Sequence, residues 1–133
     1  MKGLFISGSG TDIGKTFIAQ HLIGLLTQSR TVAVRKPVES DCTLVDGKLI
    51  TKDASKLIAL SNATDNIDTV CPYRFESCSS AESASKAENI NLSLGHLVKA
   101  CNSNEFVVVE GAGGLLSPMA ENTLNIDLAK ALD

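Results

Sequence analysis

GLFISGSGTDIGKT, residues 3–16, joins a short apolar run to a glycine-rich turn and the start of a helical pattern. The run at residues 3–7 has no polar face and lies between glycines, which predicts a buried strand. Apolar side chains at helical spacing predict a helix over residues 14–28, and they are Phe17, Ile18, Leu22, Leu25 and Leu26. A strand, a glycine turn and a helix in this order are typical of phosphate binding, because glycine N–H groups can approach the anion and the helix N-terminus attracts it.

The turn follows the phosphate-loop pattern G-x-x-x-x-G-K-[ST] except at its first position, which is Ser9 between Gly8 and Gly10. Counted from Gly8, the loop is one residue longer than the pattern. We expect Lys15 to reach the β- and γ-phosphates of a nucleotide and Thr16 to offer its hydroxyl to Mg²⁺. A plain glycine-rich turn before a helix is the alternative, and the strand ahead of the turn favours phosphate binding.

The remaining chain alternates between apolar runs and helical patterns. Apolar runs predict strands over residues 31–35 and 106–109, and helical spacing predicts helices over residues 53–60, 92–101 and 126–132. This order predicts an α/β fold, with a parallel sheet flanked by helices on both faces. Sheets of this kind bind ligands at the edge where the carboxyl ends of the strands meet. The polar residues 77–91 are compatible with a surface loop or with a poorly ordered lid.

The composition is that of an ordinary globular domain, with 133 residues, 44% of them apolar, and a net charge of −3. The length predicts one domain over residues 1–133. Three strong strands form a thin sheet for this architecture, so we expect the natural chain to continue beyond Asp133. The acidic balance argues against a nucleic-acid partner, and the short apolar runs argue against a membrane span or a signal peptide. We therefore expect a cytoplasmic protein.

The spacing of the cysteines disfavours a metal site. Cys42, Cys71, Cys78 and Cys101 form no C-x-x-C pair, and neither histidine of the chain lies within four residues of any of them. Free thiols in a reducing compartment are the simpler interpretation.

Three charged residues lie at the ends of predicted strands or the start of a predicted helix. Glu110 separates an apolar strand from the run Gly111-Ala112-Gly113-Gly114, and Asp53 opens a helix. Carboxylates near a phosphate loop are where nucleotide enzymes hold Mg²⁺, although Asp53 alone is also compatible with a favourable N-terminal charge. Lys36 follows the second strand, and we expect Pro37 to direct it to the edge that carries Lys15.

Together these motifs resemble those of the dethiobiotin synthetases, ATP-dependent ring-forming ligases of biotin synthesis. The matching stretches are GSGTDIGKT, RKPVES, the helix start at Asp53, CPYRF and VVVEGAGGLLSP, within residues 4–118. The lengthened loop with Asp12 and the KPV followed by Ser40 are both traits of that family. The resemblance implies a three-layer α/β/α fold of the phosphate-loop NTPase type.

The resemblance also implies a reaction in which 7,8-diaminononanoate, CO₂ and ATP give dethiobiotin, ADP and phosphate, with ATP and Mg²⁺ bound and a homodimer as the assembly. Further strands of the family would supply adenine contacts and contacts across the dimer interface. Carried over by position, Lys15 and Lys36 stabilise the carbamate and the phosphoryl group, and Thr11 and Ser40 hold the diamine. The resemblance implies that Mg²⁺ is held by Thr16, Asp53 and Glu110. It also implies that the nucleotide is bound by Asp12, Ile13, Gly14, Lys15, Thr16, Phe17, Asp53 and Glu110, with Gly111, Ala112 and Gly113 on the opposite wall.

Other functions remain open from the residues. Nucleotide-switch ATPases carry a further lysine early in the loop, where this chain has Gly10, which disfavours that class. Another amide-forming ligase, or a nucleotide-binding module without catalysis, would share the same loop, because a fold does not by itself determine a substrate.

Overall fold

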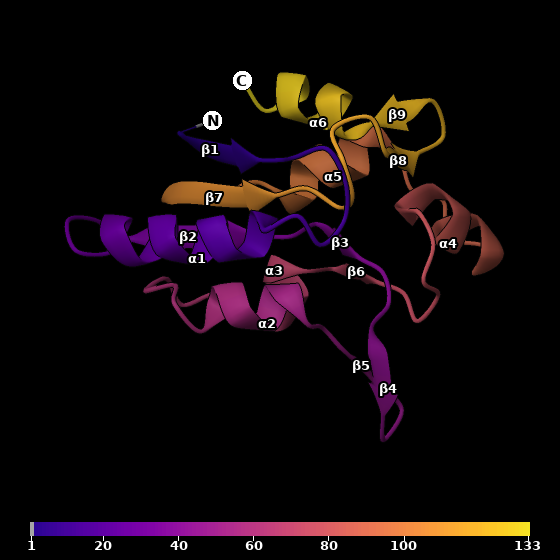
Figure 1. Cartoon of the computed structure of the whole chain (residues 1–133), viewed down its shortest axis with the longest axis horizontal. Helices are drawn as coiled ribbons and strands as arrows, with labels where there is room; N and C mark the ends of the chain where they lie inside the picture. The colour runs from indigo at the N-terminus through magenta and orange to yellow at the C-terminus, as the bar shows by residue number, and fades with distance from the viewer. Residues whose placement is uncertain (1) are drawn as a thin grey trace.

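The computed structural model describes residues 2–133. At their centre lies a three-stranded parallel sheet (Figure 1). The sheet has the order β1-β7-β2, formed by β1 (Gly3–Ile6), β7 (Phe106–Glu110) and β2 (Val32–Arg35). Phe5 pairs with Val109, and Val34 pairs with Val108. Because all three strands run in the same direction, their carboxyl ends meet at one edge, as the sequence predicted.

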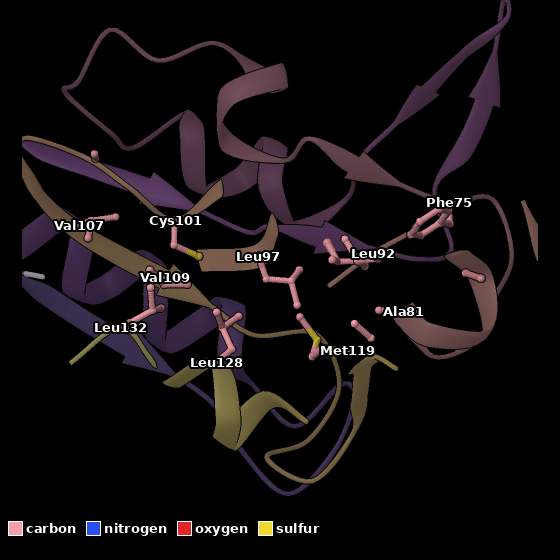
Figure 2. Close-up of a cluster of buried hydrophobic side chains, with 14 residues drawn as sticks. Phe75, Ala81, Leu92, Leu97, Cys101, Val107, Val109, Met119, Leu128 and Leu132 are labelled. Atoms are coloured by element: carbon pink, nitrogen blue, oxygen red, sulfur yellow. The ribbon is translucent and has the colours of Figure 1, made fainter. Parts of the chain in front are cut away.

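Helices cover both faces of this sheet, because alternate residues of each strand point to opposite sides. On β7, Val108 packs with α1 (Lys15–Leu26), α2 (Asp53–Ile58) and α3 (Ile67–Val70). Val107 and Val109 pack on the other face with α4 (Ala81–Ala87), α5 (Leu94–Ala100) and α6 (Asn125–Ala131). Figure 2 shows this second cluster, where Leu97 of α5 and Leu128 of α6 lie beside the strand valines. The predicted α/β fold with helices on both faces is confirmed.

Short strand pairs extend the structure beyond the sheet. β3 (Val38–Glu39) pairs with β6 (Tyr73–Arg74) in parallel, and β8 (Pro118–Ala120) pairs with β9 (Thr123–Leu124). β4 (Thr43–Val45) and β5 (Lys48–Ile50) form a hairpin that projects from the body of the molecule (Figure 1). Its turn, Asp46-Gly47, has two positive φ angles, which is the geometry that two-residue hairpins favour. The sequence analysis predicted none of these pairs.

Capping side chains determine where several helices begin. Asn66, Ser80 and Ser93 accept hydrogen bonds from backbone N–H groups in the first turns of α3, α4 and α5. The sequence left residues 77–91 as either a surface loop or a poorly ordered lid. The structure instead forms α4 within them, with Ser80 as its cap and with Ala81 and Ala84 buried. Every helix and sheet strand predicted from sequence lies within two residues of the observed bounds.

Two expectations about burial are wrong. β1 was expected to be buried, but it lies at an edge of the sheet within residues 2–133, and Leu4 is 40% exposed. On α1, the predicted apolar positions Phe17 and Leu25 are exposed, whereas Ala19 and Ile23 are fully buried. Ala19 and Ile23 are four residues apart and share one face of the helix, and only this narrow face meets the sheet.

None of the helices that residues 2–133 form is both long enough and apolar enough to cross a membrane.

Candidate functional site

The phosphate loop connects the end of β1 to the start of α1. Gly14, directly before the helix, has a φ of 99°, a left-handed conformation that favours glycine. Within residues 2–133, no side chain caps α1, and its first turn has no acidic residue. Its first N–H groups and the positive end of its dipole are therefore available to an anion. The structure supports the phosphate-binding interpretation of residues 8–16.

A second glycine-rich loop, residues 111–117, follows β7 and packs against the phosphate loop. The N–H of Leu115 donates to the carbonyl oxygen of Gly8 at 2.8 Å. A Cβ at Gly114 would lie 2.7 Å from the carbonyl oxygen of Ser9, so this approach requires glycine. The buried Asn125 donates from Nδ2 to the carbonyl oxygens of Ala112 and Gly114 and holds the loop from the start of α6.

A buried ion pair lies where β2 and β7 end. Lys36 Nζ lies 2.7 Å from Glu110 Oε1, and their side chains are only 5% and 1% exposed. Thr16 of α1 donates its hydroxyl to the same carboxylate oxygen at 2.9 Å. Asp53, the first residue of α2, places Oδ2 3.7 Å from Lys36 Nζ. Three elements and the connection that follows β2 thus bring together side chains that are up to 94 residues apart in the sequence.

The two lysines of the site have opposite pKa shifts. Burial by itself lowers the pKa of Lys36, but the charge and hydrogen bond of Glu110, with Asp53 and Glu39, outweigh it and raise that pKa. Burial, followed by the charge of Lys36, lowers the pKa of Lys15. Lys15 donates to the carbonyl oxygen of Gly10, within the phosphate loop. Lys36 is therefore held as a cation by its carboxylate partners, whereas Lys15 carries a charge that the folded chain does not fully compensate.

The oxygen atoms at this site suit Mg²⁺. Glu110 Oε2 is buried and has no hydrogen-bond partner within residues 2–133, so one carboxylate oxygen is available for a ligand. Residues 2–133 contain no cluster of three or more His, Cys, Asp or Glu side chains arranged to hold a metal. Mg²⁺ commonly takes one or two carboxylates and completes its shell with water and phosphate oxygens. Glu110, Asp53 and the Thr16 hydroxyl fit that pattern.

Two adjoining cavities surround these side chains. A cavity of 220 Å³ is lined by Thr11, Asp12, Gly14, Lys15, Thr16, Phe17, Lys36, Asp53, Lys56, Glu110 and Gly113. A cavity of 460 Å³ shares Thr11, Asp12, Lys36, Asp53, Lys56 and Gly113 with it and adds, among others, Glu39, Ser40, Lys52, Cys78 and Ala112. A third cavity, of 890 Å³, lies away from the site at the opposite edge of the sheet, where Thr31 and Glu105 precede β2 and β7. Below, the larger and the smaller cavity are the two cavities of the site.

Most of the site residues predicted from sequence meet around these two cavities, and two do not line them. Ile13 is half exposed, and Gly111 packs against Asn125 and Phe5. Phe17 lines the smaller cavity while its ring is largely exposed beside that of His21. The sequence analysis gave no role to Glu39 or Asn125. A strand-end carboxylate in the quoted stretch RKPVES was a signal for Glu39, whereas nothing in the sequence singled out Asn125.

Comparison with known proteins agrees with this geometry. A family model described as an AAA domain matches residues 2–133. The chain belongs to this AAA-domain family. Within it, the chain is 60% identical over its whole length to a protein of Vesicomyosocius okutanii subsp. Calyptogena okutanii (strain HA), named ATP-dependent dethiobiotin synthetase BioD. Proteins of the same name in Ruthia magnifica subsp. Calyptogena magnifica and Rhodopirellula baltica are 59% and 34% identical over 100% and 94% of the chain.

The chain spans only part of these AAA-domain relatives. It covers 62% of the first two proteins and 52% of the third. The resemblance to dethiobiotin synthetases that the motifs indicated is confirmed by these identities.

Proposed function

We propose that this chain carries the ATP- and Mg²⁺-dependent cyclo-ligase activity of a dethiobiotin synthetase, converting 7,8-diaminononanoate, CO₂ and ATP into dethiobiotin, ADP and phosphate. The observation that carries the proposal is the convergence of Lys15, Lys36, Asp53, Glu110 and the Thr16 hydroxyl at one edge of the sheet. The names of the relatives support the same activity.

The first step takes place in the larger of the two site cavities, that of 460 Å³. One amine nitrogen of the diamine attacks the carbon of CO₂, and loss of a proton leaves a carbamate. Thr11 and Ser40 line this cavity and offer hydroxyl groups to the diamine. The ammonium of Lys36 lies between the two cavities, where it can neutralise the charge that develops on the carbamate.

The second step is phosphoryl transfer between the two cavities. A carbamate oxygen attacks the γ-phosphorus of ATP, and the bond to the β–γ bridging oxygen breaks to release ADP. The N-terminus of α1 and Lys15 bind the phosphates, and Lys36 orients the attacking carbamate. Mg²⁺, held by Thr16, Asp53 and Glu110, would neutralise charge on the phosphate oxygens.

The last step closes the ring. The second amine nitrogen attacks the carbonyl carbon of the mixed carbamic–phosphoric anhydride, phosphate leaves, and a proton is released as the urea forms. These steps require positioning and charge neutralisation and no protein nucleophile. The proposal includes a homodimer in the cytoplasm, in which further strands of the family supply the adenine contacts and the substrate contacts across the dimer interface.

Phosphate release from MgATP and bicarbonate, measured with and without 7,8-diaminononanoate, tests the proposal. We expect release to depend on the diamine and ¹³C from labelled bicarbonate to appear in a product with the mass of dethiobiotin. Lys15→Ala should abolish release, whereas Lys99→Ala is the matched control, because Lys99 is exposed on α5 and borders neither site cavity. ATP binding without diamine-dependent release would instead support a nucleotide-binding module.

A further inference from the structure

The start of α2 is capped by a side chain from a distant strand. Lys52 occupies the N-cap position, and its side chain caps no N–H group of the helix within residues 2–133. The carboxylate of Glu39, in β3, takes that role. Its Oε1 accepts from the N–H groups of Lys52 and Asp53, the latter at 2.8 Å, and its Oε2 accepts from Ala54 N–H at 2.8 Å. Three N–H groups that an isolated helix leaves unpaired are thus satisfied by one residue.

Glu39 is itself held firmly. It is 4% exposed, it pairs with Arg74 in the β3–β6 ladder, and its carbonyl oxygen accepts from Phe75 N–H at 2.9 Å. Within residues 2–133, Glu39 forms no ion pair with a basic side chain. Its buried charge is therefore stabilised by the three N–H groups at the start of α2, together with the nearby charge of Lys36.

The capped residues belong to the candidate site. Asp53 donates its N–H to Glu39 and lines both cavities, with its Oδ2 3.7 Å from Lys36 Nζ. Ser40, the neighbour of Glu39, lines the larger cavity. Between Ser40 and Lys52 the chain leaves the body of the molecule as the β4–β5 hairpin and returns (Figure 1). The hydrogen bonds of Glu39 to residues 52–54 join the two ends of this segment at the base of the hairpin.

We propose that Glu39 is a positioning residue, whose carboxylate holds the first turn of α2 so that Asp53 faces the metal and the nucleotide phosphates. The inference rests on the proposed function only in assigning Asp53 to the metal. A helix of six residues receives little support from its own hydrogen bonds, so its start depends on this cap. Without the carboxylate, Asp53 retains its charge but loses its defined place beside Lys36 and Glu110.

Binding of Mn²⁺ in the presence of a non-hydrolysable ATP analogue, followed by the electron paramagnetic resonance signal of free Mn²⁺, tests this without any turnover. We expect Glu39→Ala to weaken Mn²⁺ binding roughly tenfold, a typical effect of losing a residue that orients a metal ligand. Glu39→Gln retains one acceptor oxygen and should weaken Mn²⁺ binding less than Glu39→Ala does. Ser93→Ala removes the cap of α5, on the other face of the sheet, and should leave Mn²⁺ binding unchanged.

Amide hydrogen exchange of residues 52–54 supplies a second readout on the same variants. Faster exchange there in Glu39→Ala, together with weaker Mn²⁺ binding, would support the inference. Unchanged Mn²⁺ binding in Glu39→Ala would overturn it, even with faster exchange, because the cap would then be structural alone. If Glu39→Ala does not fold, equal Mn²⁺ binding by Glu39→Gln and the wild type overturns the inference.

Failure of the proposed ligase activity gives a different result. If the wild-type protein binds Mn²⁺ with the nucleotide analogue but shows no diamine-dependent phosphate release, the comparison of Glu39 variants still decides the inference. If the wild type binds no Mn²⁺ with the analogue, the metal role of Asp53 is wrong, and the role of Glu39 is overturned with it.

Discussion

The two sides of the candidate site are held in different ways. Lys36 and Glu110 follow or end adjacent strands of the central sheet and are almost completely buried. Asp53 stands at the start of a six-residue helix, and its side chain is 35% exposed. Backbone ladders hold the first side, which we call the strand side, whereas a single side-chain cap holds the second, the helix side. The difference indicates that the strand side contributes to stability in addition to its proposed chemical role, and that the helix side can be changed with less cost to the fold.

The largest expected effect comes from breaking the pair on the strand side. Lys36→Ala leaves the Glu110 carboxylate buried with Thr16 as its remaining hydrogen-bond partner. Loss of one partner of a buried pair typically costs about 3–5 kcal/mol in the free energy of unfolding. Urea denaturation followed by circular dichroism measures it.

A matched double variant, Lys36→Met with Glu110→Leu, should recover much of this stability while leaving phosphate transfer inactive. A loss below about 1 kcal/mol for Lys36→Ala would mean that solvent reaches the carboxylate and that the pair is not truly buried. In the absence of urea, where Lys36→Ala is expected to remain folded, turnover should fall more than ATP affinity does.

Lys15 should separate chemistry from stability. The lowered pKa of Lys15, caused first by burial and then by Lys36, means that its charge is unfavourable in the folded chain. We expect Lys15→Ala to reduce phosphoryl transfer more than about tenfold, equivalent to about 1.4 kcal/mol of transition-state free energy, without lowering the unfolding free energy. Single-turnover phosphate release and urea denaturation provide the two measurements. Retention of more than about a tenth of the wild-type rate would contradict the role of Lys15.

On the helix side, Asp53→Asn should change metal use and little else. The amide retains the size of the side chain, and the position is partly exposed, so we expect the unfolding free energy to change by no more than about 0.5 kcal/mol. The Mg²⁺ concentration that gives half-maximal phosphate release should rise about tenfold, since one charged ligand is lost. Asp46→Asn, at an exposed carboxylate in the turn of the β4–β5 hairpin that lines neither site cavity, is the control. If Asp53→Asn lowered the unfolding free energy as much as Lys36→Ala does, the proposed difference between the strand side and the helix side would be wrong.

The smallest effect is a difference in thiol labelling. Cys78 is exposed at the larger cavity, whereas Cys42, Cys71 and Cys101 are buried. Burial raises the pKa of all three buried thiols, that of Cys101 to about 12, which keeps them protonated and unreactive. With iodoacetamide at pH 8, peptide mass spectrometry should find Cys78 alkylated first and the other three only after denaturation. Comparable labelling of Cys42 would show that the base of the hairpin opens readily.

Much of this architecture follows from local patterns. The apolar runs at residues 31–35 and 106–109 favoured buried strands, and the phosphate loop predicted a strand before it and a helix after it. The choice of buried face on α1 was wrong because apolar residues surround that helix, so its periodicity does not single out the strip at Ala19 and Ile23. The hairpin was missed although Asp46-Gly47 is a typical two-residue turn, because its two strands are only three residues long and project their apolar side chains largely into solvent. The helix α4 was missed because its small and polar residues carry little periodic hydrophobic signal.

The sequence by itself determined the fold class, the phosphate loop and the charged residues at the strand ends, because each depends on residues close together in the chain. Only the tertiary structure decided which of these charges meet. It paired Lys36 with Glu110, across 74 residues, and assigned Glu39 to cap a helix 13 to 15 residues away. The physical reason is that a buried carboxylate must be hydrogen-bonded, and its donors come from whichever segments pack beside it in the folded chain. The spacing of residues in the sequence does not indicate which segments these are.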